Sequence, residues 1–291
     1  MKRSFDIITD SGCDMPLEYL QKHDIVQVKL GFTMDDVQYE GENGKSISAE
    51  NFYEKLRRGS MPTTYQITGE TAKKYMEESL KNGRDVLVIA FSSALSGTAG
   101  SFFVASRELI KKYKNRKVRI VDSLCASMGE GLLLDYVVKK AEEKGATVDQ
   151  VADFTEELKH KICHHFTVDN LFHLKRGGRV NATTALVGSI LKIKPILHVN
   201  DEGKLISIGK AMGRKKALKT LVERFFEMKD IDENDPVFIS HGDCINDVEY
   251  VCALIRAKLP SVHIEINYVG NVIGAHAGAG TVAIFHKGLH R

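Results

Sequence analysis

Short apolar runs alternate with amphipathic stretches over the first half of the chain. The clearest run, residues 85–91, is apolar at every position after Asp85, as in a strand that a parallel sheet buries on both faces. Residues 5–9 and 118–121 form similar runs, and all three end in polar turn residues. Helical periodicity follows at 99–113 and 129–144. Strand-turn-helix units repeated in this way predict an α/β layer with a mostly parallel sheet.

The same half contains an extended run over 25–32 and two further helices, 49–58 with Ser48 as N-cap and 69–81. From residue 195 the extended runs come closer together. The strands expected there are 196–199, 205–209, 237–240 and 264–269, with helices at 215–228 and 247–257. A turn at residues 200–203 predicts a hairpin. This change of pattern predicts a second domain, of the α+β class.

The length of 291 residues agrees with about two domains, at roughly 150 residues per domain. We place a mostly parallel α/β domain at residues 1–165 and an α+β domain at 166–291. Hydrophobic residues make up 43% of the chain and charged residues 27%, which is ordinary for a globular protein and excludes fibrous and low-complexity classes.

The longest apolar runs are far shorter than the ~20 residues of a membrane-spanning helix. Asp6 interrupts the N-terminus where the apolar part of a signal peptide would begin, so a cytoplasmic protein is expected. The five cysteines include no C-x-x-C pair, which argues against a disulfide framework or a zinc ribbon and predicts reduced thiols.

Charge is unevenly distributed along the chain. Residues 175–219 carry eleven Lys or Arg and two acidic residues, a net charge of +9, while the rest of the chain carries −6. The segment lacks interleaved aromatic residues and a helix-turn-helix signature, so it favours a solvated or protein-docking face over a nucleic-acid site.

The loop after the run 85–91 is rich in hydroxyl groups and opens a helix. Ser96 and Gly97 stand at the mouth of that helix, where free N–H groups and the helix dipole favour an anion. Ser96 also fits a simple helix cap, and the two interpretations are compatible. No Lys stands at a P-loop position and no G-x-S-x-G surrounds Ser96, which disfavours nucleotide-phosphate binding and a serine hydrolase.

Other candidate residues are more isolated. His276 stands in a glycine-dense loop, residues 270–280, which favours it as a ligand contact. A His160/His164 pair at i, i+4 on a helix lacks a third metal ligand, so no metal site is expected. Asp10 and Asp122 end strands, and with His276 they define the alternative of a free-standing phosphotransferase or hydrolase.

Several motifs, in this order and spacing, resemble the DegV family of bacterial fatty-acid-binding proteins. The resemblance covers almost the whole chain. Its motifs are Thr9-Asp10-Ser11 with Asp14, Pro62-Thr-Thr-Tyr-Gln66, Ser93-Ala-Leu-Ser-Gly-Thr98, Leu174-Lys-Arg-Gly-Gly-Arg179, Lys194-Pro-Ile-Leu197 and Gly274-Ala-His-Ala-Gly-Ala-Gly280.

The resemblance implies a two-domain DegV-like fold that binds a long-chain fatty acid between the domains. It implies no cofactor and no catalytic activity of the chain's own. It further implies that the protein presents the carboxylate to a separate ATP-binding kinase subunit, which makes an acyl-phosphate for phospholipid synthesis.

Carried over to this sequence, the resemblance implies that Thr64, Ser96 and Gly97 bind the carboxylate, with His276 beside it. It places Arg179 on the side facing the kinase, and Arg176 and Arg214 are further candidates for that docking surface. The residues expected to line the acyl chain are Phe91, Leu95, Phe102 and Phe103. Tyr65 and Ile67 replace the usual Ser and Pro, and Ala279 replaces a common Pro, which leaves the chain-length preference open.

Overall fold

The computed structural model describes residues 3–169, 171–180, 192–232 and 234–291. Its first layer is a parallel sheet of order β2-β1-β6-β7. The strands are β1 (Phe5–Asp10), β2 (Ile25–Val28), β6 (Asp85–Ala90) and β7 (Val118–Asp122). The expected parallel sheet is confirmed, and so is the mixed α/β class.

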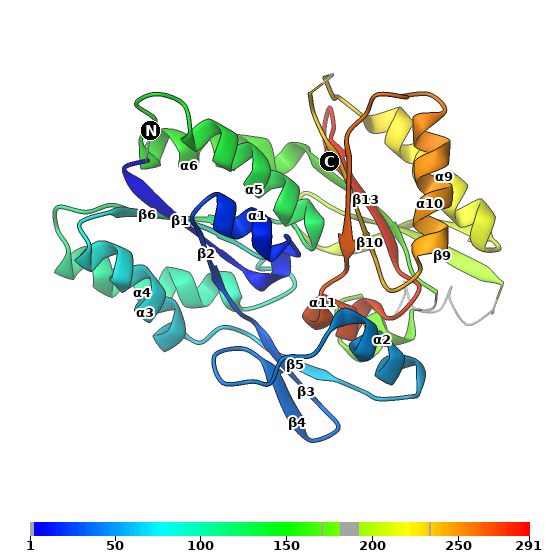
Figure 1. The fold of residues 1–291 in the computed structure, drawn as a ribbon, viewed down its shortest axis with the longest axis horizontal. Helices are drawn as coiled ribbons and strands as arrows, with labels where there is room; N and C mark the ends of the chain where they lie inside the picture. The colour runs from blue at the N-terminus through cyan, green and yellow to red at the C-terminus, as the bar shows by residue number, and fades with distance from the viewer. Residues whose placement is uncertain (1–2, 170, 181–191, 233) are drawn as a thin grey trace.

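Helices cover both faces of this parallel sheet (Figure 1). On one face lie α3 (Gly69–Lys81) and α4 (Thr98–Lys112), and on the other lie α1 (Leu17–Lys22), α5 (Met128–Ala141) and α6 (Val148–Leu158). The strand side chains alternate accordingly: Val86 and Val88 join the core of the first face, and Leu87 and Ile89 that of the second. This two-sided burial explains the continuous apolar run at 85–91.

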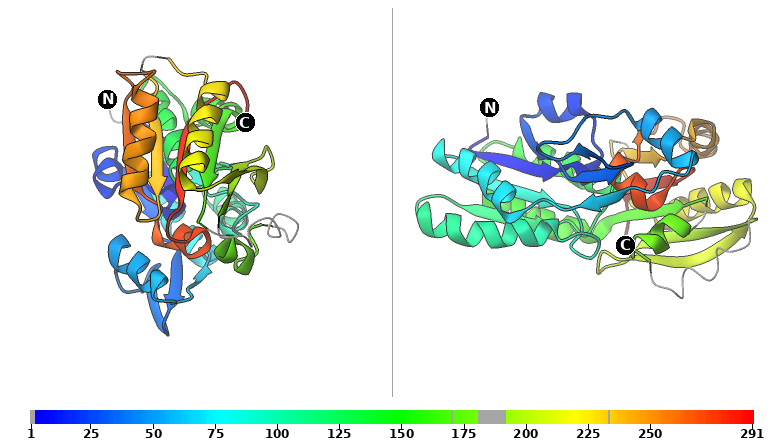
Figure 2. Two further views of the ribbon diagram at one scale, coloured as in Figure 1. Left: turned by 90° about the vertical axis from the view of Figure 1, so that its right-hand side faces the viewer. Right: turned by 90° about the horizontal axis from the view of Figure 1, so that it is seen from below.

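The second layer is a six-stranded sheet of order β10-β9-β8-β13-β11-β12, mostly antiparallel. Its strands are β8 (Ile162–Thr167), β9 (Ile193–Val199), β10 (Leu205–Met212), β11 (Val237–His241), β12 (Ile264–Tyr268) and β13 (Val282–Lys287). Its outer face is covered by α9 (Arg214–Met228) and α10 (Ile245–Arg256), which face the viewer in the left panel of Figure 2. The predicted hairpin between β9 and β10 is confirmed.

Helix α5 joins the two layers. Almost every one of its side chains is buried, because it packs on the parallel sheet and also contacts β8, β11 and β13. One hydrophobic cluster consequently includes Ile7 of the first sheet and Phe285 of the second. The boundary that the sequence predicts between the two domains, at residue 165, falls inside strand β8.

A small third sheet, of order β4-β3-β5, projects below the other two (Figure 1). It contains β3 (Gly31–Met34), β4 (Val37–Glu40) and β5 (Thr63–Tyr65), and it packs with α2 (Ala49–Arg57) and α11 (Asn271–Ala277). The single strand expected at 25–32 is wrong, because β2 pairs with β1 while β3 begins this separate sheet. None of the helices within the described ranges is both long and apolar enough to cross a membrane.

Candidate functional site

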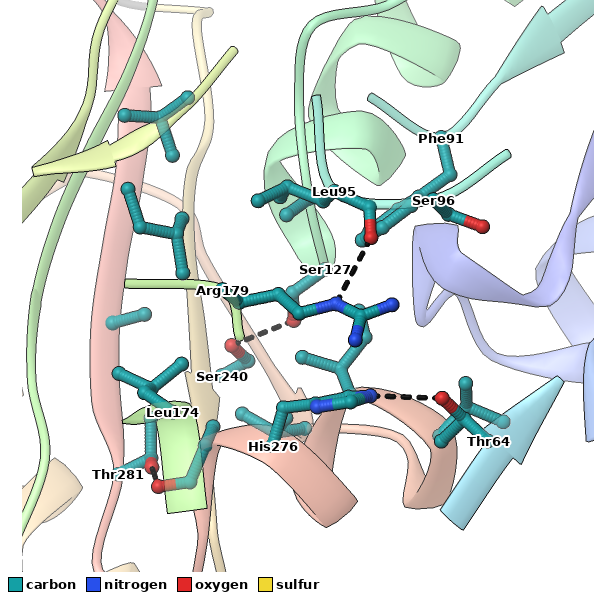
Figure 3. A pocket seen from close by; sticks show the side chains of 18 of the residues that line it. Thr64, Phe91, Leu95, Ser96, Ser127, Leu174, Arg179, Ser240, His276 and Thr281 are labelled. Carbon is teal, nitrogen blue, oxygen red and sulfur yellow. Dashed lines mark hydrogen bonds between the residues drawn. The ribbon is translucent and has the colours of Figure 1, made fainter. Parts of the chain in front are cut away.

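A cavity of about 370 Å³ lies between the parallel sheet and the six-stranded sheet. The loop after β6 contributes Phe91 and Leu95, and β8 and β13 contribute Phe166 and Phe285. The volume falls within the range of about 300–1,000 Å³ that is usual for small-molecule sites. Its lining is predominantly apolar, with polar side chains in two places, around Thr64 and His276 and around Ser127 and Ser240 (Figure 3).

Four of these polar residues form what we call the polar cluster: Thr64, Ser96, Arg179 and His276. Strand β5 and helix α11 bring Thr64 and His276 together, and the Thr64 hydroxyl lies 2.8 Å from Nε2 of His276 (Figure 3). A Cβ on Gly177 would lie 2.0 Å from Nδ1 of His276, so a glycine is required where the chain passes this ring. The sequence-predicted residues Thr64, Ser96, Gly97 and His276 all line the cavity.

His276 is held as a neutral imidazole. Burial, followed by the nearby Arg179, Arg176 and His173, lowers the pKa of His276 from 6.5 to about 4. A neutral imidazole has one donor nitrogen and one acceptor nitrogen. Nδ1 lies buried against Gly177 and has no hydrogen-bond partner within the described residues, whereas Nε2 faces the Thr64 hydroxyl.

The positively charged side chain of Arg179 lines the cavity. Its Nε donates to the carbonyl of Leu95 at 3.1 Å, and its guanidinium also donates to the carbonyl of Gly177. Burial lowers the pKa of Arg179, and no carboxylate within the described ranges forms an ion pair with it. Among the described residues this guanidinium bonds only to neutral carbonyls, and such a group favours an anionic ligand.

Ser96 and Gly97 stand immediately before the first residue of α4. The Thr98 amide donates to Oγ of Ser96 at 3.3 Å, but the N-cap residue of α4 is Gly97, which makes no side-chain cap bond. The expectation that Ser96 caps the helix is therefore wrong, although Ser96 does line the cavity. A Cβ on Gly97 would lie 2.0 Å from Oε1 of Gln66, so a larger residue there would displace the end of the Gln66 side chain. The positive end of the 15-residue helix α4 therefore adds to the charge of Arg179.

The expected apolar lining is only half correct. Phe91 and Leu95 line the cavity, but Phe102 and Phe103 do not. Phe102 is completely buried between α4 and the parallel sheet, and Phe103, the next residue around the helix, is 42% exposed. The remaining apolar lining comes largely from residues that sequence reasoning missed, namely Leu30, Phe166, Leu174, Val199, Leu205, Val269, Val272, Ile273, Ala277, Ala283 and Phe285.

A second polar group lines the cavity, centred on Ser127 and Ser240, whose hydroxyls lie 3.0 Å apart. The Ser127 hydroxyl also donates to the carboxyl group of Asp14 at 2.5 Å. Burial raises the pKa of Asp14 to about 7, although the Ser127 bond opposes that shift. His164 also lines the cavity, with Nε2 accepting from the Ala126 amide at 3.2 Å.

Several other expectations need correction. Asp10 is buried and accepts the amides of Gly12 and Phe91, and Asp122 accepts those of Ser93 and Leu124. Neither carboxylate lines the cavity, so they form no reactive group with His276. These backbone contacts fit the turn interpretation of both residues.

The expected docking arginines are engaged within the chain. Arg179 lines the cavity, Arg176 donates to the carbonyls of Pro62 and Ala275, and Arg214 pairs with Asp247 at 2.8 Å. The segment 270–280, expected to be a loop, contains α11, and its glycines at 278 and 280 have positive φ angles. Of the two departures beside Thr64, Tyr65 lines the cavity, whereas Ile67 is buried in the core between α3, α4 and the sheet.

Comparison with known families decides the identity of the fold. A family profile described as "Uncharacterised protein, DegV family" matches residues 4–287. The chain belongs to the DegV family. A DegV domain-containing protein of Clostridium perfringens is 42% identical over 287 residues, which cover 98% of each chain.

Solved DegV structures superpose on almost the whole chain. A DegV lipid-binding protein of Thermotoga maritima is 32% identical, with a TM-score of 0.82 and 99% of both chains covered. A DegV family protein of Thermus thermophilus, described by its fatty acid binding, is 27% identical, with a TM-score of 0.87 over 99% of this chain and 100% of that one. The DegV fold that the sequence motifs predict is confirmed.

Proposed function

We propose that this DegV protein binds a long-chain fatty acid in the cavity, with the carboxylate at the polar cluster and the acyl chain along the apolar lining. The observation that carries the proposal is the placement of Arg179, His276 and the α4 N-terminus together in the lining of a predominantly apolar cavity. An anionic head group on an apolar tail is the ligand that matches both parts. The fatty acid binding of the related Thermus thermophilus protein supports the same ligand class.

The tail supplies most of the affinity in this proposal. Each buried CH₂ group contributes ~0.8 kcal/mol, so a sixteen-carbon chain gains on the order of 10 kcal/mol before the cost of ordering it. The polar cluster fixes which end of the molecule enters first. A hydrogen bond to a charged group adds about 1.5–3 kcal/mol.

We further propose that the chain presents the bound carboxylate to a separate ATP-binding kinase subunit and supplies no catalytic activity of its own. A carboxylate oxygen then attacks the γ-phosphorus of ATP, ADP leaves, and an acyl-phosphate forms for phospholipid synthesis. The neutral His276 supports this role, because it holds the carboxylate without transferring a proton that would quench its nucleophilicity.

The test begins with native mass spectrometry of the purified chain before and after organic extraction. A fatty acid released in a one-to-one ratio supports the carrier function. Acyl-phosphate formation is then measured with radiolabelled ATP, with and without a cognate kinase subunit. Product that needs both proteins supports presentation, whereas ATP or ester turnover by the chain alone would overturn the non-catalytic role.

A further inference from the structure

Three potential metal ligands meet on the face of the six-stranded sheet that is turned away from the cavity. Cys163 on β8 pairs directly with His286 on β13, and His165 follows two positions along β8. One ligand atom of each residue lies within 4.8 Å of the others. The three side chains are buried, with exposures of 1% for Cys163, 4% for His165 and 0% for His286.

Strand alternation separates this group from the fatty-acid cavity. His164 and Phe285 point into the cavity, whereas their neighbours Cys163, His165 and His286 lie on the α9 side. The His286 ring packs edge-on against Phe225 of α9, with 4.9 Å between centroids. The sequence around residues 160–165 shows no third metal ligand near its histidines. The third candidate ligand, His286, lies on strand β13, which is distant in the sequence.

The two imidazoles present free nitrogens in a dry setting. Both ring nitrogens of His165 and Nε2 of His286 are buried and have no hydrogen-bond partner within the described residues. Nδ1 of His286 lies 2.9 Å from the carbonyl of Lys287, which selects the tautomer with the proton on Nδ1 and leaves the Nε2 lone pair free. A backbone carbonyl that orients a histidine in this way is the usual outer contact of a metal-binding imidazole.

Burial and the surrounding charges keep both imidazoles neutral, which leaves their nitrogens able to bind a metal ion. Burial and the cationic groups Arg224 and Lys229 lower the pKa of His165 and His286, respectively. Burial raises the pKa of the Cys163 thiol to about 12 although Arg291 opposes that shift, so the sulfur is protonated until a metal ion displaces the proton. The sulfur now donates to the carbonyl of His290 at 3.1 Å, a bond that a metal ion would replace.

We propose that Cys163, His165 and His286 form a binding site for one thiophilic transition-metal ion, with Zn²⁺ as the ion that the ligand set fits. Thiolate and imidazole are the ligands that Zn²⁺ prefers, at about 2.3 Å and 2.0–2.1 Å. These bond lengths imply ligand separations of roughly 3.5 Å, so the three side chains close by about 1 Å on binding. The fourth position is left for water or for His198, which pairs with His165 from β9.

Binding forms one metal–sulfur and two metal–nitrogen bonds and releases the thiol proton to solvent. The ion would cross-link β8 to β13 behind the cavity.

The experiment uses the full chain, treated with a chelator and titrated with Co²⁺ and then Zn²⁺. We expect one Co²⁺ per chain, with a thiolate-to-cobalt charge-transfer band and four-coordinate ligand-field bands, all displaced by Zn²⁺. Zn²⁺ should also raise the midpoint of thermal unfolding, because it binds only the folded chain tightly. Cys163→Ser should abolish the charge-transfer band, and His286→Gln should reduce affinity at least about tenfold.

Matched controls are Cys252→Ser, a thiol on α10, and His263→Gln, an exposed imidazole, both of which should bind like wild type. Circular dichroism and fatty-acid binding report whether the site variants fold, since the cavity lies on the other face. The proposal is overturned if the folded wild-type chain binds no Zn²⁺. It is equally overturned if Co²⁺ binds without a thiolate band, or if His263→Gln removes the binding.

Discussion

The hydroxyl of Thr64 lies 2.8 Å from Nε2 of His276, although 212 positions separate the two residues in the chain. The contact joins the small sheet to the short helix α11 and fixes one edge of the polar cluster. It leaves the other imidazole nitrogen of His276 without a protein partner within the described residues. In our proposal this pair contacts the ligand's carboxylate through the Thr64 hydroxyl, which His276 orients.

Thr64→Val removes the hydroxyl and keeps the shape of the side chain. We expect fatty-acid affinity to fall roughly tenfold or more, because His276 loses the bond that orients it and the carboxylate loses a donor. Calorimetric titration of delipidated protein measures the change. Thr63→Val, at the exposed neighbouring position of β5, is the control and should bind like wild type. Equal affinities in the two variants would remove Thr64 from the site.

Arg179→Ala should weaken the binding of a fatty acid by about 10- to 100-fold, since a charge-assisted bond is lost. The binding of the corresponding fatty alcohol should change little, because that ligand has no charge for the guanidinium to neutralise. Lys175→Ala, on the exposed side of the same segment, is the control. Unchanged fatty-acid affinity with lost acyl-phosphate formation would instead support the kinase-facing position that the sequence motifs imply.

The lowered pKa of His276 predicts that this residue makes the free energy of unfolding depend on pH. The unfolded chain takes up a proton at this residue near pH 6.5, but the folded chain does so only near pH 4. Between these values the unfolded state binds more protons, so this residue lowers stability as the pH falls through that window. The full effect is on the order of 3 kcal/mol by pH 4.

His276→Gln removes this contribution, so the variant should gain stability relative to wild type as the pH falls from about 7.5 to about 4.5. The comparison has to be made as a difference between the two proteins. Asp10 and Asp14, whose pKa values burial raises to about 7, act with the opposite sign over much of the same range. Urea unfolding at the two pH values gives the measurement, and a difference that does not vary with pH would contradict the prediction.

Local patterns sufficed for much of the first half of the fold. The helix at 69–81 has the bounds that its periodicity predicts, and Ser48 caps α2 as expected, accepting the Asn51 amide. The run at 25–32 failed because it has no turn signal at Lys29-Leu30, although the chain changes sheets there. Which strand pairs with which is decided by distant segments, and a local pattern does not contain that information.

The residues of the candidate site also fall into two groups, those that the sequence identifies and those that only the structure identifies. Ser96 and His276 stand out locally, at a helix mouth and in a glycine-dense segment, whereas Thr64 could be found only through the resemblance to the DegV family. Leu205 and Phe285 belong to ordinary strand patterns, and only the packing of two sheets shows that they face a cavity rather than a filled core. The mistaken assignment of Phe102 and Phe103 has the same cause, because a helical pattern identifies an apolar face but not what that face covers.

Substitutions at Leu95, Phe102 and Phe103 separate the cavity lining from the core. Phe102 has no exposed surface, so Phe102→Ala should cost about 3–5 kcal/mol of unfolding free energy while the folded fraction binds fatty acid normally. Phe103→Ala, at a 42% exposed position, should change stability by less than about 0.5 kcal/mol and leave binding unchanged.

Leu95→Ala should affect fatty-acid binding more than it affects stability. Its side chain faces the cavity and its carbonyl, which binds Arg179, is retained in the variant, so the main loss is contact with the acyl chain. We expect affinity to fall by about 1–2 kcal/mol, or roughly 5- to 30-fold. Urea unfolding and calorimetric titration of all three variants give both quantities. Weaker binding by Phe103→Ala but not by Leu95→Ala would place the acyl chain outside this cavity.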